Sequence, residues 1–522
     1  MKRTHLTFGA ALFVLGSGCA GDPPPPPAVP EAPAPTTTAT AAPAEPAREA
    51  PPPSGQAKPF RFPKVVWTEL PNGLKVATVP SKALPVVQIR VVIPGGRAAD
   101  GEKPGLASFT STMLKDGGAG SMSSRDLVTR VESLGSDLSI DTSFDATVVG
   151  LAITRDRLGE AMDILGTVVT RPQMAPAELD KLKKRTIDRL ADAARTSGSW
   201  GALMVLYRDL FALPSEQHPY ATWSPTAADV QKISVADLRA FHKKFFVPKN
   251  AFVVVAGDTT PEAAKAAVAK AFGGWSGGEA PTLSFTDPNP PESRKITLVD
   301  RPKSSQSDVY VATFGPDRAS KSWASFAVAN QILGGGVSGR LFLDVREKQS
   351  LAYGTRSSVT ELAHGPSVFS AYAGTQTAKT GLALRGLLDN LERLANTAPD
   401  ASEVEIATRY LADSFSVKLE TIGAVTNELV SLRVHGLPDD YDDAYRKEIG
   451  EITGPLALKA ASDHLRPGHE VIVVAGDAAI IGPMLSHFGE VKVVDPTRDF
   501  ARVRTIPMDP NAPLEVPRAE GK

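Results

Sequence analysis

An internal repeat is the feature that most limits what this 522-residue chain can fold into. The segment "ISVADLRAFHKKFFVPKNAFVVVAGD" begins at Ile233, and "ITGPLALKAASDHLRPGHEVIVVAGD" begins 219 positions later, at Ile452. The two segments align without a gap, so that Pro248 matches Pro467 and both end in Val-Ala-Gly-Asp. Self-similarity at one fixed offset indicates two copies of a single domain.

The repeat divides the chain into two predicted domains of similar length. We expect the first copy to span about residues 63–280 and the second about 293–500, with a Pro-rich linker at 281–292. Residues 20–62 are rich in Pro, Ala and Thr, and such a composition predicts an extended tether without a core. Residues 501–522 are predicted to form a Pro-rich tail.

Each copy is predicted to mix strands and helices without strict alternation. This order favours an α+β fold, in which each domain has a largely antiparallel sheet with helices packed on one face. Alternating or continuous apolar runs predict strands, and apolar residues at helical spacing predict helices. In the first copy the predicted strands are 87–93, 145–153 and 251–258, and the predicted helices are 105–117, 123–135, 175–195 and 260–272.

The N-terminus has the pattern of an export signal. Lys2 and Arg3 precede an apolar run at residues 6–15, which is too short to span a bilayer. Small residues then lead to Cys19, the only cysteine of the chain. The pattern resembles a bacterial lipoprotein signal that ends at Cys19, and an ordinary secretory signal with an incidental cysteine is the alternative. We therefore expect a protein on the periplasmic side of a bacterial membrane, lipid-anchored to the outer membrane.

Charge gives no indication of a nucleic-acid partner. The formal net charge is −1, and 22% of the residues are charged. A net charge near zero gives no reason to expect a nucleic acid or an anionic membrane surface as a partner. Contact with a membrane is therefore expected through the lipid anchor only.

One predicted helix has an unusual polar face. In "GLASFTSTMLKDGGAG", which begins at Gly105, the hydroxyl residues Ser108, Ser111 and Thr112 lie at i, i+3 and i+4. This spacing stacks three side chains on one face, as a metal site requires. Neutral hydroxyls are nevertheless poor ligands for zinc.

The motifs of both halves resemble the pitrilysin/insulinase family of zinc metallopeptidases. The resemblance covers about residues 63–500 and is most similar to the mitochondrial-processing-peptidase-like branch. It implies two half-clamshell domains of the metallopeptidase type. It rests on the repeat, the framework "GLASFTSTML", the segment "HPYATWSPTAADVQKISVADLRAFHKKFFVPKNAFVVVAGD" and the later "GLPDDYDDAYRKEI".

The resemblance implies that the zinc site is lost. Active members place two zinc-binding histidines and a general-base glutamate on the helix where this chain has Ser108, Ser111 and Thr112. The acid nearest to the family's third ligand is Asp188, which a solvated helix face also explains. No other metal site is predicted, so this chain is expected to need no cofactor, with zinc in a partner subunit.

The second half keeps residues that the family uses opposite the zinc. Arg346 and Tyr353 resemble a pair that binds the substrate peptide and stabilises the oxyanion at the scissile carbonyl. Packing and an ion pair on the helix are the alternative roles. Gly334, Gly335 and Gly336 match the position of a substrate-handling glycine loop in the non-zinc subunit, although they also suit a helix terminus.

Three functions are compared on these residues. The chain is predicted to be the non-zinc, substrate-binding subunit of a heteromeric metallopeptidase, with a homologous zinc-bearing subunit as partner and a peptide as substrate. An inactive peptide-binding or structural scaffold of the same fold is the alternative. A self-sufficient zinc peptidase conflicts with the three substitutions at Ser108, Ser111 and Thr112.

Overall fold

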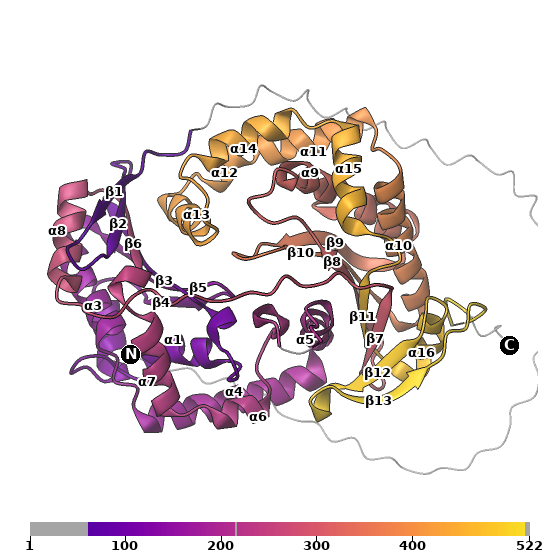
Figure 1. The fold of residues 1–522 in the computed structure, drawn as a ribbon, viewed down its shortest axis with the longest axis horizontal. Coiled ribbons are helices and arrows are strands. Elements are labelled where there is room, and N and C mark those ends of the chain that lie inside the picture. The colour runs from indigo at the N-terminus through magenta and orange to yellow at the C-terminus, as the bar shows by residue number, and fades with distance from the viewer. Residues whose placement is uncertain (1–60, 215–216, 517–522) are drawn as a thin grey trace, which may run out of the picture. The chain divides into compact units, whose positions relative to one another are not determined.

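The computed structural model describes residues 61–214 and 217–516. These residues form two β-sheets, each packed against helices (Figure 1). No helix within the two ranges is both long and apolar enough to cross a bilayer. Cys19 and nearly all of the predicted tether 20–62 lie outside the described residues.

The first sheet has six strands, and β6 near its centre is fully apolar. Strand β6 reads "FVVVAG" and is buried along its whole length, as expected for a strand with both faces covered. It pairs parallel with β2 and antiparallel with β3. The spatial order is β1 (Val66–Glu69), β2 (Lys75–Pro80), β6 (Phe252–Gly257), β3 (Val86–Pro94), β5 (Ala146–Thr154) and β4 (Ser139–Thr142).

The second sheet has seven strands and repeats the arrangement of the first. Strand β11 is likewise buried along its whole length. It pairs parallel with β7 and antiparallel with β8. The spatial order is β13 (Ala501–Ile506), β12 (Val491–Asp495), β7 (Lys295–Asp300), β11 (Val471–Gly476), β8 (Gln306–Phe314), β10 (Val368–Gln376) and β9 (Ala352–Thr360).

The two sheets confirm the fold class predicted from the repeat. Strand β11 begins 219 positions after β6, at Val471 against Phe252. The run β2-β6-β3-β5-β4 in one sheet corresponds to β7-β11-β8-β10-β9 in the other. All seven elements predicted in the first copy are present, with ends that differ by a few residues.

Helices begin and end where side chains can satisfy free backbone groups. Ser123, Thr226, Ser234 and Asp400 each accept a hydrogen bond from the third residue of a helix, in capping boxes. The helices of the first half are α1 (Leu106–Asp116), α2 (Ser124–Glu132), α3 (Leu158–Thr170), α4 (Pro176–Thr196), α5 (Gly198–Leu210), α6 (Ala227–Lys232), α7 (Val235–Phe245) and α8 (Pro261–Phe272). Those of the second half are α9 (Trp323–Gly334), the π-helix η5 (Leu341–Lys348), α10 (Thr380–Asn396), α11 (Ala401–Asp413), α12 (Phe415–Lys418), α13 (Ile422–Val434), α14 (Tyr441–Gly450), α15 (Gly454–Leu465) and α16 (Ala478–Ser486).

One face of each sheet packs on helices of its own half. Buried side chains of α1, α3, α7 and α8 form one core with β2, β3, β5 and β6. Buried side chains of α9, α10, α15 and α16 form the matching core on the second sheet. Burial of these apolar side chains is the main free-energy term that favours the two layers.

The opposite face of each sheet is covered by a helix from the other half (Figure 1). Helix α5 packs Val205, Leu206 and Leu210 against β7, β8 and β11 of the second sheet. Helix α13 packs Val425 and Leu429 against β2, β3 and β6 of the first sheet. Both helices have 13 residues. Both sheets are therefore covered on both faces, and the repeat alone did not indicate this exchange.

The sheet of the second half extends past the boundary predicted at residue 500. Strand β13 lies inside the predicted tail 501–522 and pairs antiparallel with β12, with an irregular register at Val493 and Val494. Strand β13 alternates apolar and basic side chains in "ARVRTI", and this alternation is the sequence signal for a strand at this position.

Candidate functional site

Helix α1 is fixed at its start by a carboxylate. Asp100 accepts hydrogen bonds from the backbone N–H groups of Gly105 and Ala107, each at 2.7 Å. Burial raises the pKa of Asp100 to about 7, although the two N–H groups and Arg97 act in the opposite direction. Met113 and Leu114 are fully buried under the sheet, so the polar face of α1 is held in one orientation.

The hydroxyls on α1 bond to the helix itself and to a neighbouring strand. Ser111 Oγ and Thr112 Oγ1 both donate to the carbonyl oxygen of Ser108, at 2.9 and 2.8 Å. Ser111 Oγ also lies 2.6 Å from Thr142 Oγ1 on β4. Back-bonding of this kind satisfies short hydroxyl side chains within the helix, without an outside ligand.

No carboxylate or imidazole completes this face. Asp188, the acid nearest to the expected position of the family's third ligand, is exposed on α4. Within residues 61–214 and 217–516, no group of three or more His, Cys, Asp or Glu side chains could hold a metal ion. The donor set on α1 therefore does not fit catalytic zinc, which takes three imidazole, thiolate or carboxylate ligands.

Arg346 lies on a short helix that a partly buried ion pair holds in place. Arg340, just before η5, makes a bidentate pair with Glu403 on α11, with both N–O distances at 2.7 Å. This pair lowers the pKa of Glu403. The Arg346 side chain itself is 43% exposed, lies over the Phe342 ring at 4.7 Å and reaches Glu347 at 3.5 Å. The guanidinium thus remains accessible, and short π-helices occur often at functional sites.

Tyr353 lies on β9 over a glycine that makes room for its ring. Its side chain is 54% exposed. A Cβ atom at Gly374 of β10 would lie 2.5 Å from Tyr353 Cζ and 2.8 Å from the Tyr372 hydroxyl. Tyr372 donates a hydrogen bond to Asp308 at 2.8 Å, and Ser199 of α5 donates to the same carboxylate oxygen at 2.9 Å. Burial and the nearby Asp308 charge raise the pKa of Tyr372.

Sequence reasoning missed this support for Tyr353. Asp308 is the residue that β8 places opposite Gly374, and Tyr372 lies two positions earlier on β10. An acidic residue inside the apolar run "SDVYVATF" was the available signal. A partly buried carboxylate usually has hydrogen-bond partners, so Asp308 indicated a hydrogen-bonded cluster at this position.

The glycine run at 334–336 ends a helix. Gly334 is the last residue of α9, and the N–H of Gly335 donates to the carbonyl of Asn330 at 3.0 Å. A Cβ atom at Gly334 would lie 2.7 Å from the backbone nitrogen of Ser357, so close packing on β9 explains this glycine. A substrate role for Gly334, Gly335 and Gly336 stays a prediction.

The structure places the two sets of site residues in different helical layers. Ser108, Ser111 and Thr112 belong to α1, which packs in the core of the first sheet. Arg346 belongs to η5, whose Leu341 and Val345 pack in the core of the second sheet. The two sets of predicted site residues therefore lie on elements of different halves of the chain.

Comparison with known families matches both halves to one family. Residues 75–213 match the profile described as insulinase (peptidase family M16), and residues 232–411 match the profile described as peptidase M16 inactive domain. The chain belongs to the M16 peptidase family. The family predicted from the repeat and motifs is confirmed.

The M16 relatives of this chain include proteins named as peptidases and one named as a non-peptidase. The non-peptidase homolog YmxG of Helicobacter pylori is 24% identical over 382 residues, which cover 72% of this chain and 84% of the relative. An uncharacterized zinc protease of Mycobacterium bovis is 26% identical over 381 residues, 72% of this chain and 83% of the relative. Subunit beta of the mitochondrial-processing peptidase of Blastocladiella emersonii is 26% identical over 200 residues, 38% of this chain and 42% of the relative.

A solved M16 structure has the same fold. The peptidase M16 inactive domain from Pseudomonas fluorescens aligns with a TM-score of 0.73 at 27% identity. The alignment covers 79% of this chain and 98% of that structure.

We expect the purified M16 chain to contain no stoichiometric zinc. The reason is the hydroxyl set on α1, which offers no imidazole or carboxylate to the ion. Elemental analysis after dialysis measures the zinc content. One tightly held zinc ion per chain, lost when Ser108, Ser111 and Thr112 are all changed to alanine, would contradict this reading of α1.

Proposed function

We propose that this chain is a non-catalytic M16 subunit that binds peptides and assembles with a homologous, zinc-bearing subunit. The observation behind the proposal is the asymmetry between the halves. The α1 face offers hydroxyls bonded to their own helix, whereas Arg346 and Tyr353 are exposed donors on firmly held elements. Guanidinium and phenol groups are strong donors toward a developing oxyanion.

The match of residues 232–411 to the inactive-domain profile supports the non-catalytic part of the proposal. The name of one relative, a non-peptidase homolog, supports the same part further. Another relative is named as one subunit of a processing peptidase, which supports assembly with a second chain. The partner is proposed to supply the zinc that α1 cannot hold. Mixing the two purified chains, and measuring peptidase activity that neither chain has alone, tests the proposal.

An inactive scaffold is the second candidate. The contacts of Arg346 favour it, because they lie within its own helix, to Phe342 and Glu347. In that case the two chains would assemble, and the complex would show the same activity with or without the Arg346 side chain.

We further propose that the protein acts outside the cytoplasm, held to the outer membrane through a lipid on Cys19. The Cys19→Ser variant is expected to move from the membrane fraction to the soluble fraction, because the acyl chains that hold it would be absent. Fractionation and mass spectrometry of the N-terminus measure this. If fractionation is unchanged and no acyl chain is found on the wild-type protein, Cys19 follows an ordinary secretory signal.

A further inference from the structure

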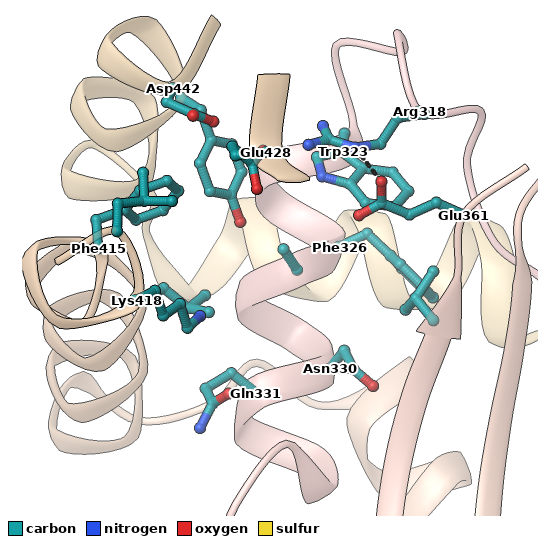
Figure 2. A pocket seen from close by; sticks show the side chains of 15 residues that line it. Arg318, Trp323, Phe326, Asn330, Gln331, Glu361, Phe415, Lys418, Glu428 and Asp442 are labelled. Carbon is teal, nitrogen blue, oxygen red and sulfur yellow. Dashed lines mark hydrogen bonds and ion pairs between the residues drawn. The ribbon is translucent and has the colours of Figure 1, made fainter. Parts of the chain in front are cut away.

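A pocket of about 260 Å³ lies in the second half, lined by neither α1 nor η5 (Figure 2). Its side chains come from α9, α11, α12, α13, α14 and β9 and from the loops that adjoin these elements. Sites that enclose a whole small molecule usually measure roughly 300–1,000 Å³. The pocket therefore suits one functional group and its stem.

The guanidinium in this pocket is already neutralised. Arg318 Nε donates to Glu361 at 2.9 Å, drawn as a dashed line in Figure 2. The guanidinium carbon also lies 4.6 Å from the centre of the Trp323 ring and 4.5 Å from that of Tyr441. Arg318 and Glu361 thus compensate each other, and two aromatic rings cover the cation.

Two carboxyl groups in the same pocket lack such a partner. Figure 2 shows Asp442 of α14 and Glu428 of α13 entering from neighbouring helices. Asp442 is 1% exposed, and its Oδ2 atom has no hydrogen-bond partner. Neither carboxyl makes an ion pair within 4.0 Å in the described part of the chain, and Lys418 of α12, which also lines the pocket, makes none either.

Burial and nearby charges disfavour the ionised forms of Asp442 and Glu428. Burial raises the pKa of Asp442 to about 7, and the Glu428 charge adds to this shift. Burial and the Glu361 charge also raise the pKa of Glu428, whereas Arg318, Lys418 and His435 act in the opposite direction. The other charged groups that act on Asp442 are Arg318, Asp443 and Glu361, of which only Arg318 favours the ionised form. A further positive charge would stabilise both carboxylates.

We propose that this pocket binds a primary ammonium group on an apolar stem, with Glu428 and Asp442 accepting its hydrogen bonds. An ammonium has three donors and no acceptor, which matches unpartnered carboxylate oxygens. Phe415 and Tyr445, which also line the pocket, contact the apolar stem. A lysine side chain of a polypeptide and a free diamine share this chemistry. The site is additional to the proposed function and does not depend on it.

The test uses the full chain and isothermal titration with capped lysine (N-acetyl-lysine amide) and 1,5-diaminopentane. We expect saturable binding of at least one of them, with a Kd on the order of 1 mM for so few atoms. Capped norleucine, which lacks the ammonium, should bind at least tenfold more weakly. Tighter binding of capped lysine would indicate a polypeptide source, and tighter binding of the diamine a free amine.

Matched variants test the two carboxyls. Asp442→Asn and Glu428→Gln keep the side-chain shapes and should each weaken binding at least tenfold. Glu448→Gln, on the exposed face of the same helix and not among the charges that act on Asp442, should leave the Kd unchanged. If Asp442→Asn does not fold, Glu428→Gln at the partly exposed position gives the same measurement. Lys418→Met removes a competing cation and should strengthen binding.

The pH dependence follows from the raised pKa of Asp442. Its carboxyl is neutral below about pH 7 and ionised above it, so binding should strengthen between pH 6 and pH 8. Equal binding of capped lysine and capped norleucine would overturn the proposal. So would an unchanged Kd in both Asp442→Asn and Glu428→Gln, or saturable binding of Ca²⁺ or Mg²⁺ alone with no binding of either amine.

Discussion

Replacing Arg346 by alanine is expected to lower the turnover of the reconstituted two-chain peptidase by roughly 10²–10³-fold, with the complex still assembled. The guanidinium is proposed to act on charge that develops at the scissile carbonyl, so its loss raises the barrier and leaves subunit contacts intact. Tyr353→Phe removes one hydroxyl and should act in the same direction. Steady-state kinetics of peptide cleavage, with size-exclusion chromatography of each complex, measure both effects.

Lys348→Ala is the matched control for Arg346→Ala. Lys348 is also exposed on η5, so this variant removes a positive charge from the same helix without touching the proposed donor. Its kcat should equal that of the wild-type complex. Full activity in both the Arg346 and Tyr353 variants would remove the catalytic-subunit function and leave the scaffold.

Leu429→Ala is expected to lower the free energy of unfolding by roughly 2–5 kcal/mol, the usual range for a leucine removed from a packed core. Leu429 is fully buried on α13, which belongs to the second half and packs on the first sheet. The variant should therefore loosen both halves. Denaturant titration gives the stability change, and hydrogen exchange of β6 and β11 shows where it acts.

Asn427→Ala on the same helix provides the reference for Leu429→Ala. Asn427 is exposed, so its loss should change stability by no more than about 0.5 kcal/mol. Faster exchange in β6 alone, with β11 unchanged, would mean that the two halves unfold independently in spite of the shared helix.

Much of the fold could be predicted because the repeat supplies the same evidence twice. The apolar runs that form β6 and β11 lie at the predicted offset, and the helix predicted at residues 123–135 is present as α2. The exchange of α5 and α13 could not be predicted in this way. Both helices have apolar faces, and periodicity identifies such a face without identifying the sheet that covers it.

The sequence predicted a property of the candidate site only where the type of side chain alone decides which ligand can bind. Hydroxyls at Ser108, Ser111 and Thr112 argue against zinc whatever their geometry. The support of Tyr353 by Gly374, Tyr372 and Asp308 depends on strand register across β8, β9 and β10, which a single sequence does not fix. The pocket proposed to bind an ammonium group is lined by residues from five helices, so no local sequence motif could indicate it.

The crossing of α5 and α13 has a consequence for how this chain can change. Equivalent helices packed reciprocally on each other's sheets form the arrangement of a domain-swapped dimer, here with both copies fused in one polypeptide. Each copy contributes one helix to the core of the other copy, and this packing stabilises both copies. One copy can therefore carry Ser108, Ser111 and Thr112 where zinc ligands would lie, while the fused pair keeps its architecture. The other copy keeps Arg346 and Tyr353 exposed on its own elements, where the proposed partner subunit could reach them.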